Sequence, residues 1–365
     1  MIAGEASGDL HGSNLIKAIK AKDNNAVIQC WGGDLMEAAG GKLVKHYREL
    51  AFMGLVEVLM NLRTILSNIK FCKKDIEAFQ PDVLICIDYP GFNLRIAAYA
   101  KSIGIKVSYF ISPKIWAWNQ GRVHKIKKVV DQMLCILPFE VDFYKKFGME
   151  VQYVGNPLKD AIANYTFQQD FIAANNLPQK PIIAILPGSR KMELLNILPT
   201  MLAVQNHFPN HQFIVAAAPG LPASFYEQFN LAGAKLLFNC TYDILANAEL
   251  AMVTSGTATL ETALLNVPQV VCYKANSLSV FIARLLVKIK YISLVNLIAD
   301  QQIVIELIQQ DCTVVNIAQA LKVIAVNELG RSEQLTKYQA LQQMVGPEGA
   351  SLRAASAIYQ FVNSK

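Results

Sequence analysis

The turn that follows residues 182–186 has the residue types of a phosphate-binding site. Gly188, Ser189 and Arg190 come shortly after this apolar run, and a helical pattern then extends from 192 to 207. A buried strand that leads into a helix leaves the first backbone N–H groups of the helix unpaired and directed to one place, and Arg190 adds a guanidinium beside them. The turn therefore predicts a bound phosphate. The alternative is that Ser189 only caps the helix.

A second turn repeats this arrangement later in the chain. Residues 250–253 lead into Ser255, Gly256 and Thr257, a helical pattern covers 258–265, and Glu261 lies on the same helix face as Thr257. The N-terminus of such a helix binds phosphate, and a carboxylate one turn further on accepts hydrogen bonds from a sugar diol. Together the two turns predict a nucleotide diphosphate that carries a sugar. The alternative is that Ser255 caps the helix and Glu261 complements its dipole.

Asp88 is the candidate general base. It directly follows residues 83–87, which have the composition of a buried strand. Carboxyl ends of strands in open α/β sheets are where ligands bind, and partial burial there raises the pKa of a carboxylate and strengthens it as a proton acceptor. The alternative is an aspartate that only forms a turn before Pro90 and Gly91.

Two further segments are predicted at strand ends. Glu5 and Ser7 lie in a turn after a first strand that is shorter than expected, which predicts either a clipped strand or a misplaced start codon. Residues 112–118 follow another strand and include Trp116 and Trp118. These indoles either contact a hydrophobic ligand or close the core.

Apolar runs alternate with amphipathic helical stretches along the chain. The predicted strands are 82–87, 105–111, 132–137, 151–154, 181–186, 212–217, 235–238, 250–253 and 269–273, and the clearest helix is 55–79. Strands and helices in alternation form parallel sheets with helices on both faces. We therefore expect an α/β fold with two Rossmann-like domains that face a cleft.

The length of 365 residues also favours two domains, because single hydrophobic cores rarely grow so large. The pattern breaks near Gly155, Asn156 and Pro157. We place one domain at 1–160, a second at 161–346 and a final helix at 347–365. This last helix is predicted to pack back on the first domain.

Composition limits the partners. Hydrophobic residues make up 53% of the chain, but no uninterrupted apolar run is long enough to span a bilayer. The net charge of +6 is modest and gathers at 70–74, 122–128 and 284–290, which favours an acidic surface or a phosphorylated ligand over nucleic acid. Residues 278–298 form either a helix in a lipid headgroup layer or a helix buried between domains. Seven scattered cysteines and five unpaired histidines predict reduced thiols in a cytosolic protein without a metal site.

Seven motifs of the chain resemble the lipid-A-disaccharide synthase family, which are glycosyltransferases of the GT-B fold. They are 3–9 (AGEASGD), 53–59 (MGLVEVL), 87–93 (IDYPGFN), 112–118 (SPKIWAW), 186–190 (LPGSR), 255–261 (SGTATLE) and 293–297 (SLVNL). Their order and spacing match the family over nearly the whole chain. The departures are the short first strand and Val295, where a proline is expected.

The resemblance implies an inverting transfer of 2,3-diacylglucosamine from UDP-2,3-diacylglucosamine to 2,3-diacylglucosamine 1-phosphate (lipid X), which releases UDP and a β-1,6-linked disaccharide. It implies no cofactor, and a peripheral place on the cytoplasmic face of the inner membrane of Gram-negative bacteria. Domain 1–160 is then the acceptor side, and domain 161–346 binds the donor. The sequence leaves open a monomer or a homodimer.

The resemblance also implies residue roles. Asp88 corresponds to the base on the acceptor 6-hydroxyl, and Glu5 lies in the acceptor-side cleft. Arg190 corresponds to the diphosphate-binding arginine, Glu261 to the ribose-binding carboxylate and Asn296 to a polar residue near the donor. The other assigned residues are Gly188, Ser189, Ser255, Gly256 and Thr257 for UDP, and Ser7, Met53, Asn93, Trp116 and Trp118 for the acceptor and its lipid.

Two other functions stay open at this point. One is a UDP-sugar epimerase on the same fold. The other is a non-catalytic peripheral membrane protein that senses a sugar nucleotide.

Overall fold

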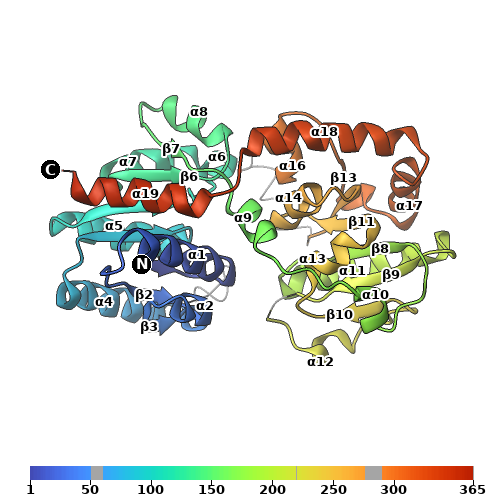
Figure 1. The fold of residues 1–365 in the computed structure, drawn as a ribbon, viewed down its shortest axis with the longest axis horizontal. Coiled ribbons are helices and arrows are strands. Elements are labelled where there is room, and N and C mark those ends of the chain that lie inside the picture. Colours follow the sequence, from blue (N-terminus) through green and yellow to red (C-terminus); the bar gives the residue numbers. More distant parts are fainter. Residues whose placement is uncertain (51–60, 219, 276–289, 365) are drawn as a thin grey trace. The chain divides into compact units, whose positions relative to one another are not determined.

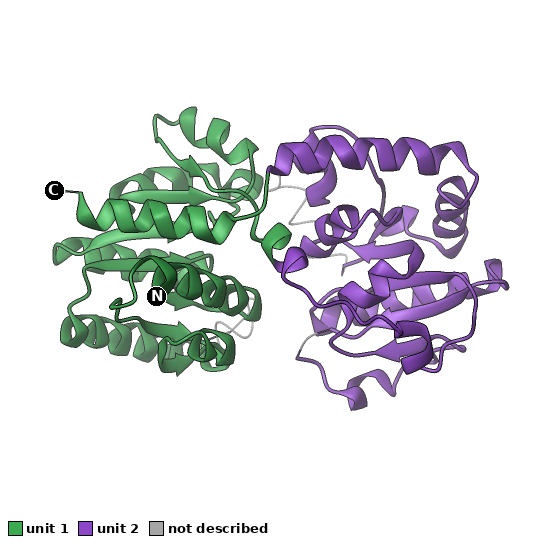
Figure 2. Cartoon of the chain, viewed as in Figure 1, with its two compact units in different colours: residues 1–160, 347–365 green, residues 161–346 purple. Residues whose placement is uncertain are grey.

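The computed structural model describes residues 1–50, 61–218, 220–275 and 290–364. Figure 2 shows that the chain divides into two compact units, one of residues 1–160 with 347–365 and the other of residues 161–346. Each unit holds one sheet, and every strand pair in both sheets is parallel. The predicted fold class, α/β with two Rossmann-like parallel-sheet domains, is confirmed.

The first unit is built on a seven-stranded sheet with the order β3-β2-β1-β4-β5-β6-β7. Its strands are β1 (Ile2–Ala3), β2 (Gln29–Gly32), β3 (Lys42–His46), β4 (Val83–Ile87), β5 (Lys106–Phe110), β6 (Gln132–Cys135) and β7 (Gln152–Tyr153). The central strand β4 is apolar throughout because helices cover both faces of the sheet.

Side chains alternate along β4 and separate two groups of helices. Ile85 and Ile87 share a core cluster with residues of α1 and α19, whereas the Cys86 thiol lies against the Asn93 carbonyl of α5. The first group is α1 (Ala6–Lys22), α2 (Asp34–Ala38) and α19 (Ala350–Asn363), and the second is α4 (Leu62–Phe79), α5 (Pro90–Ser102) and α7 (Val123–Val129). The shorter helices are α6 (Ile115–Trp118), α8 (Phe139–Lys145) and α9 (Pro157–Ala163), and α9 contains the boundary between the units.

The end of the chain returns to the first unit, as Figure 1 shows for the red helix α19. Helix α19 packs along α1. The Asp160 carboxylate accepts hydrogen bonds from the backbone N–H groups of Gly349, Ala350 and Ser351 at 2.6, 3.2 and 3.0 Å, and so caps the start of α19. The prediction that the last helix packs back on the first domain is confirmed.

The second unit is built on a six-stranded sheet with the order β10-β9-β8-β11-β12-β13. Ile183 and Ile185 of β8 belong to one core cluster, and Ile182, Ala184 and Leu186 belong to another on the opposite face. The strands are β8 (Ile182–Leu186), β9 (Gln212–Ala216), β10 (Lys235–Leu237), β11 (Ala248–Thr254), β12 (Gln269–Tyr273) and β13 (Ile305–Ile308). The helices are α10 (Phe171–Ala174), α11 (Lys191–Ala203), α12 (Ala223–Tyr226), α13 (Thr241–Ala246), α14 (Thr257–Leu264), α16 (Leu294–Ala299), α17 (Val314–Val323) and α18 (Leu329–Val345).

Some elements differ from the sequence prediction. Strands β2, β3 and β13 were not predicted; β3 and β13 are edge strands, which carry polar and charged residues that hide the apolar signal. The helix predicted at 55–79 is described from Leu62 onward as α4, and residues 51–60 lie outside the described residues. In the segment 278–298, residues 276–289 lie outside the described residues, and Leu294 begins the short, buried helix α16.

Each sheet has one point where the strand order reverses, between β1 and β4 in the first unit and between β8 and β11 in the second. At such a point the loops leave neighbouring strands toward opposite faces and open a crevice at the carboxyl edge, where α/β proteins bind ligands. The segments that follow β1, β4, β8 and β11 carry most of the predicted site residues.

Candidate active site

The reversal point of the first unit brings Glu5 and Asp88 to neighbouring strand ends. Ala3 of β1 pairs with Ile87 of β4, so Glu5 and Asp88 both begin loops at the same edge. The ring of Tyr89 fills the space above Gly4, where an added Cβ atom would lie 2.3 Å from it. Glycine at position 4 therefore allows this close approach of Tyr89.

The backbone at Asp88 is strained. Asp88 and Tyr89 have φ values of 43° and 48°, a left-handed conformation that costs non-glycine residues on the order of 1 kcal/mol or more each. The Asp88 carbonyl accepts hydrogen bonds from Asn93 Nδ2 at 2.8 Å and from the Tyr109 hydroxyl, and the Asp88 N–H donates to the Phe110 carbonyl at 3.2 Å. These anchors fix the direction in which the carboxylate leaves the chain.

The environment of Asp88 favours proton acceptance. Burial raises the pKa of its carboxyl, and the Lys114 ammonium and the Tyr89 backbone N–H partly offset this by lowering the pKa. A raised pKa makes the carboxylate a stronger base than a solvated aspartate, provided that it remains ionised at the working pH.

The side chain of Asn93 connects the ends of β1 and β4. Its side chain is fully buried, and Nδ2 lies within hydrogen-bond distance of the carbonyls of Ile2, Ile87 and Asp88. It is therefore an anchor of the turn, a role that the sequence analysis did not assign to it. Contact of Asn93 with the acceptor stays a prediction.

The other acceptor-side residues differ in exposure. Ser7 is exposed in the first turn of α1. Trp116 is buried at 7% exposure and donates a hydrogen bond to Glu140, whereas Trp118 is 46% exposed with the Arg122 guanidinium 4.9 Å from its ring centroid. The structure thus gives Trp116 the core position and leaves Trp118 on the surface. Met53 lies outside the described residues.

The reversal point of the second unit brings the two predicted phosphate turns side by side. Leu186 of β8 pairs with Val253 of β11, so the turns at Gly188 and Ser255 leave adjacent strands. Gly188 has φ 104°, and a Cβ atom there would lie 2.7 Å from the Glu193 carboxylate and 3.5 Å from Thr254 Cγ2. Glycine is needed at position 188 for both the conformation and the space.

Neither serine caps the helix that follows it. Arg190 is the N-cap residue of α11 and Gly256 that of α14, and neither helix start has a side-chain cap hydrogen bond. The Ser255 hydroxyl instead donates to the Ile292 carbonyl at 2.7 Å. The alternative in which Ser189 and Ser255 are simple caps is therefore wrong. Glu193 is the one acidic residue in the first turn of α11, and the first turn of α14 has none.

Two charged side chains flank these helix starts. The Arg190 side chain is 63% exposed, with a guanidinium nitrogen 3.6 Å from a Glu193 oxygen, a weak surface pair that a phosphate can replace. Glu261 is half-buried on α14 beside exposed Thr257. Burial raises the pKa of Glu261, and the hydrogen bond donated by the Tyr242 hydroxyl at 2.7 Å lowers it.

Asn296 is fully engaged within its own unit. Its Nδ2 donates to the Val304 carbonyl and to Glu306 Oε1, both at 2.9 Å, and its Oδ1 accepts from the N–H groups of Ile303 and Val304 at 2.7 and 3.0 Å. These bonds use the whole hydrogen-bonding capacity of an amide. Asn296 is positioned to shape the loop near Ser255, and a direct contact with the donor stays a prediction.

Glu306 of β13 was missed by the sequence analysis. Its carboxylate accepts hydrogen bonds from the Ile292 N–H at 2.9 Å, from the Ser293 N–H and hydroxyl at 3.0 and 2.7 Å, and from Asn296 Nδ2. The Ser255 hydroxyl donates to the Ile292 carbonyl, and Glu306 accepts from the Ile292 N–H, so Glu306 fixes the residue to which Ser255 is bonded. An isolated glutamate in a short edge strand gives no sequence signal for such a role.

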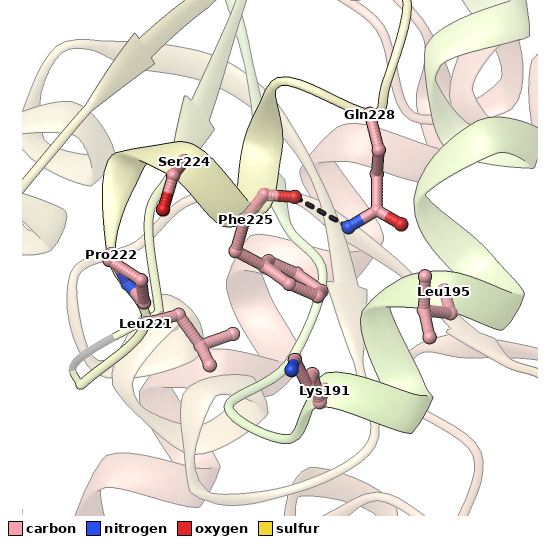
Figure 3. A pocket seen from close by; sticks show the side chains of 7 residues that line it. All are labelled: Lys191, Leu195, Leu221, Pro222, Ser224, Phe225 and Gln228. Carbon is pink, nitrogen blue, oxygen red and sulfur yellow. Dashed lines mark hydrogen bonds between the residues drawn. The ribbon is translucent and has the colours of Figure 1, made fainter.

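A pocket of about 580 Å³ lies next to the first phosphate turn. Figure 3 shows Lys191 and Leu195 of α11 opposite Phe225 and the start of α12. Its lining is Lys191, Leu195, Leu221, Pro222, Ser224, Phe225 and Gln228. The pocket therefore combines apolar walls with one cation, directly after Arg190 in the chain.

Among the described residues, no group of histidine, cysteine and acidic side chains has a metal-binding arrangement. Over the same residues, no helix has the length and apolar character needed to cross a membrane. The seven cysteines are all free thiols, and six of them are buried.

Two Rossmann-like units, each with a parallel sheet and one reversal point, define the GT-B class, which is shared by glycosyltransferases and UDP-sugar epimerases. The chain is similar to the UDP-GlcNAc 2-epimerase from Neisseria meningitidis bound to UDP-GlcNAc, with a TM-score of 0.68, 12% identity and coverage of 96% of this chain and 97% of that one. It is equally similar to the glycosyltransferase of kitacinnamycin, with a TM-score of 0.68, 14% identity and coverage of 99% and 97%. At such low identity these likenesses show the fold.

Sequence comparison is more specific. The family model described as lipid-A-disaccharide synthetase matches residues 1–359. The lipid-A-disaccharide synthase of Myxococcus xanthus is 35% identical over 99% of this chain and 97% of its own length, and that of Nitrosococcus oceani is 38% identical over 95% and 92%. The chain belongs to the lipid-A-disaccharide synthase family.

Proposed function

We propose that the protein transfers 2,3-diacylglucosamine from UDP-2,3-diacylglucosamine to lipid X, and forms the β-1,6-linked lipid A disaccharide 1-phosphate and UDP. The observation that carries the proposal is the family match over residues 1–359. The groups at the two reversal points support it, because one unit has a buried carboxyl whose pKa is raised and the other has two helix starts without a side-chain cap. The first unit is then the acceptor side and the second binds the donor.

In this proposal the second unit binds UDP through three kinds of group. The first N–H groups of α11 and α14 bind the diphosphate, and Arg190 exchanges Glu193 for a phosphate oxygen. Glu261 accepts hydrogen bonds from the ribose diol, while Tyr242 occupies one of its oxygens and fixes its orientation. Gly188, Ser189 and Gly256 keep the backbone close to the ligand.

The chemical step is a direct displacement. Asp88 removes the proton of the acceptor 6-hydroxyl while that oxygen attacks the anomeric carbon, the bond to the UDP oxygen breaks, and the configuration inverts. Arg190 and the two helix N-termini stabilise the negative charge that develops on UDP. Glu5 lies at the neighbouring strand end. Burial raises the pKa of the Tyr89 hydroxyl and the charge of Glu5 raises it further, which supports a part for Glu5 in the electrostatics of the acceptor side.

The lipid part of the donor has a candidate site in the pocket beside α11. Its apolar walls, Leu195, Leu221 and Phe225, suit an acyl chain, and its place after Arg190 puts it next to the diphosphate. Leu195→Asn should raise the KM for the acylated donor and leave UDP affinity unchanged. An equal loss of UDP affinity would contradict this assignment.

We further propose that the protein works on a membrane surface, with α4 as a contact. Leu62, Leu66 and Phe71 of this helix are 46%, 53% and 45% exposed, and Arg63, Lys70 and Lys74 are exposed beside them. Exposed apolar side chains with cations suit an anionic headgroup layer. Because α4 leads into β4, its first turns lie toward the carboxyl edge of the sheet, the edge of Asp88.

One assay tests the function against its alternatives. Purified protein is incubated with both acylated substrates, and disaccharide and UDP are expected in equal amounts, with none when lipid X is omitted. Conversion of UDP-N-acetylglucosamine to its 2-epimer without an acceptor would show an epimerase. Binding of the sugar nucleotide without any product would show a sensor.

A further inference from the structure

A buried carboxylate, Glu140 of α8, takes no part in the proposed chemistry. Its side chain is 1% exposed. Oε1 accepts a hydrogen bond from the Trp116 indole N–H at 3.1 Å, and Oε2 accepts one from the Leu137 backbone N–H at 3.1 Å. No ion pair involves Glu140 in the described structure. A buried carboxylate without a cation destabilises the fold, which calls for another reason for its presence.

Both contacts of α8 reach one strained segment. Residues 112–118 form this segment. Trp116, within the segment, is bonded to Glu140 of α8. Ser112, at the start of the segment, has its hydroxyl 2.8 Å from the hydroxyl of Tyr144, which also belongs to α8. Ile111, directly before the segment, has φ 67°, which is an outlier for a β-branched residue. Such a backbone persists only when its surroundings hold it. Glu140 and Tyr144 hold it at two points.

The same segment carries a charge that acts on the proposed base. Lys114 is exposed in the turn that follows β5. The end of β5 lies against Asp88, because Phe110 pairs with Ile87 and its carbonyl accepts a hydrogen bond from the Asp88 N–H at 3.2 Å. Burial raises the pKa of the Asp88 carboxyl, and the Lys114 ammonium lowers it. Lys114 lies between the two anchored residues, Ser112 and Trp116. A shift of the segment would therefore change the distance between Lys114 and Asp88.

We propose that Glu140 is a positioning residue for the transfer reaction, which holds segment 112–118 through Trp116 and so keeps Lys114 beside Asp88. The kinetic consequence rests on the proposed function, whereas the effect on Asp88 does not. Glu140 touches no substrate in this proposal.

The surroundings of Glu140 set its charge. Burial raises the pKa of its carboxyl, the hydrogen bonds from Leu137 and Trp116 act in the opposite direction, and the pKa that results is about 7. The neighbouring groups stay neutral in that range, because the pKa values of Tyr144 and Cys135 are raised and that of Tyr153 is raised to about 12. These neighbours come from α8, β6 and β7. The charged Arg353 of α19 donates to the Val154 carbonyl at 2.8 Å and acts on Tyr153, whose pKa it lowers against the larger effect of burial.

The test compares Glu140→Gln, Trp116→Phe, Lys114→Gln and the double variant Glu140→Gln/Lys114→Gln. Glutamine keeps one acceptor but turns an amide group toward a donor, so one hydrogen bond is lost. Trp116→Phe removes the indole N–H and keeps an aromatic ring against Phe139, whose centroid lies 4.9 Å from that of Trp116. It serves as the second probe if Glu140→Gln fails to fold.

The first readout needs no substrate. The pKa of Asp88 is measured by carboxyl carbon NMR, with the Asp88 signal assigned by its loss in Asp88→Asn. We expect this pKa to rise in Glu140→Gln, Trp116→Phe and Lys114→Gln, because each weakens the influence of the lysine. The pKa of Asp88 in the double variant should be no higher than in Lys114→Gln alone. An unchanged Asp88 pKa in the first two variants, or additive rises in the double variant, would overturn the inference.

The second readout is the acid limb of kcat/KM for disaccharide formation. It should move to higher pH in the same variants by the same amount as the Asp88 pKa, with the Kd of UDP unchanged. A loss of rate that is equal at every pH would mean a merely structural role and would also overturn the inference. If the wild-type protein forms no disaccharide, the proposed function fails, and the NMR titration still decides the role of Glu140.

Discussion

Replacing Asp88 with asparagine removes the proposed proton acceptor and keeps the shape of the side chain. The turn is held through the main chain of residue 88: its carbonyl accepts hydrogen bonds from Asn93 and Tyr109, and its N–H donates to the Phe110 carbonyl. None of these three bonds uses the carboxylate. The strained backbone should therefore stay in place. A general base contributes about 10²–10⁴-fold to the rate, so kcat should fall by that factor, or about 3–5 kcal/mol of transition-state stabilisation.

The assay follows disaccharide and UDP with saturating acylated substrates. The Kd of UDP, measured by calorimetry, should not change, because the groups proposed to bind UDP lie on the second unit. Asp82→Asn is the matched control, since Asp82 is an exposed aspartate immediately before the same strand. A kcat for Asp88→Asn equal to that of Asp82→Asn would refute the assignment.

The pH dependence of kcat reports on the same group. Asp88 accepts a proton only when ionised, and burial raises its pKa above that of a solvated aspartate. As the pH falls, kcat should therefore begin to decrease at a higher pH than it would with a solvated aspartate as the base. This acid limb should be absent from the residual activity of Asp88→Asn. An identical limb in the variant would assign it to another group.

Three further predictions concern binding and stability. Arg190→Ala should weaken UDP binding by about tenfold to a hundredfold, which is the range of a charge-assisted hydrogen bond. Arg95 is an exposed arginine of the first unit, and Arg95→Ala should not change UDP affinity; equal affinities of the two variants by calorimetry would exclude Arg190. Leu66→Glu should lower binding to anionic vesicles by at least about tenfold in a flotation assay. Leu329 of α18 is 73% exposed, and Leu329→Glu should have no effect; equal losses of vesicle binding in the two variants would exclude α4 as the contact. Glu306→Gln should lower the free energy of unfolding by about 1–3 kcal/mol and weaken UDP binding, because an amide cannot accept all four hydrogen bonds; unchanged denaturation and affinity would contradict its role.

Much of the fold could be predicted from the sequence because the central strands of both sheets are buried on both faces. Such strands are continuous apolar runs, as in β4 and β8, and each ends in a turn whose residues stand out. Since carboxyl ends of parallel strands share one edge, the positions of Asp88, Arg190 and Ser255 followed from the pattern. Edge strands such as β3 gave no comparable signal, because half of their surface is polar.

The roles of polar side chains could be predicted only in part. Asn296 lies in a motif that suggests a ligand contact, but its amide is satisfied by Val304, Ile303 and Glu306. Trp116 could close the core or contact a ligand, and its burial and its hydrogen bond to Glu140 decided for the core. These partners are fixed by tertiary structure, and a single sequence does not show which residues meet.

Each reversal point has residues proposed to act on the substrate and other residues that hold the turns in place. The proposed substrate groups, such as Asp88 and Arg190, lie on turns with unfavourable backbone or exposed side chains. The anchors of the turns, such as Asn93 and Glu306, instead hold several backbone groups by hydrogen bonds within the fold. Substitution of a substrate group should then lower activity and leave the melting temperature unchanged or higher, because strained and exposed groups contribute little to stability. Substitution of an anchor should lower both. Measuring the two quantities together therefore separates residues that act on the substrate from residues that hold them, which activity alone does not do.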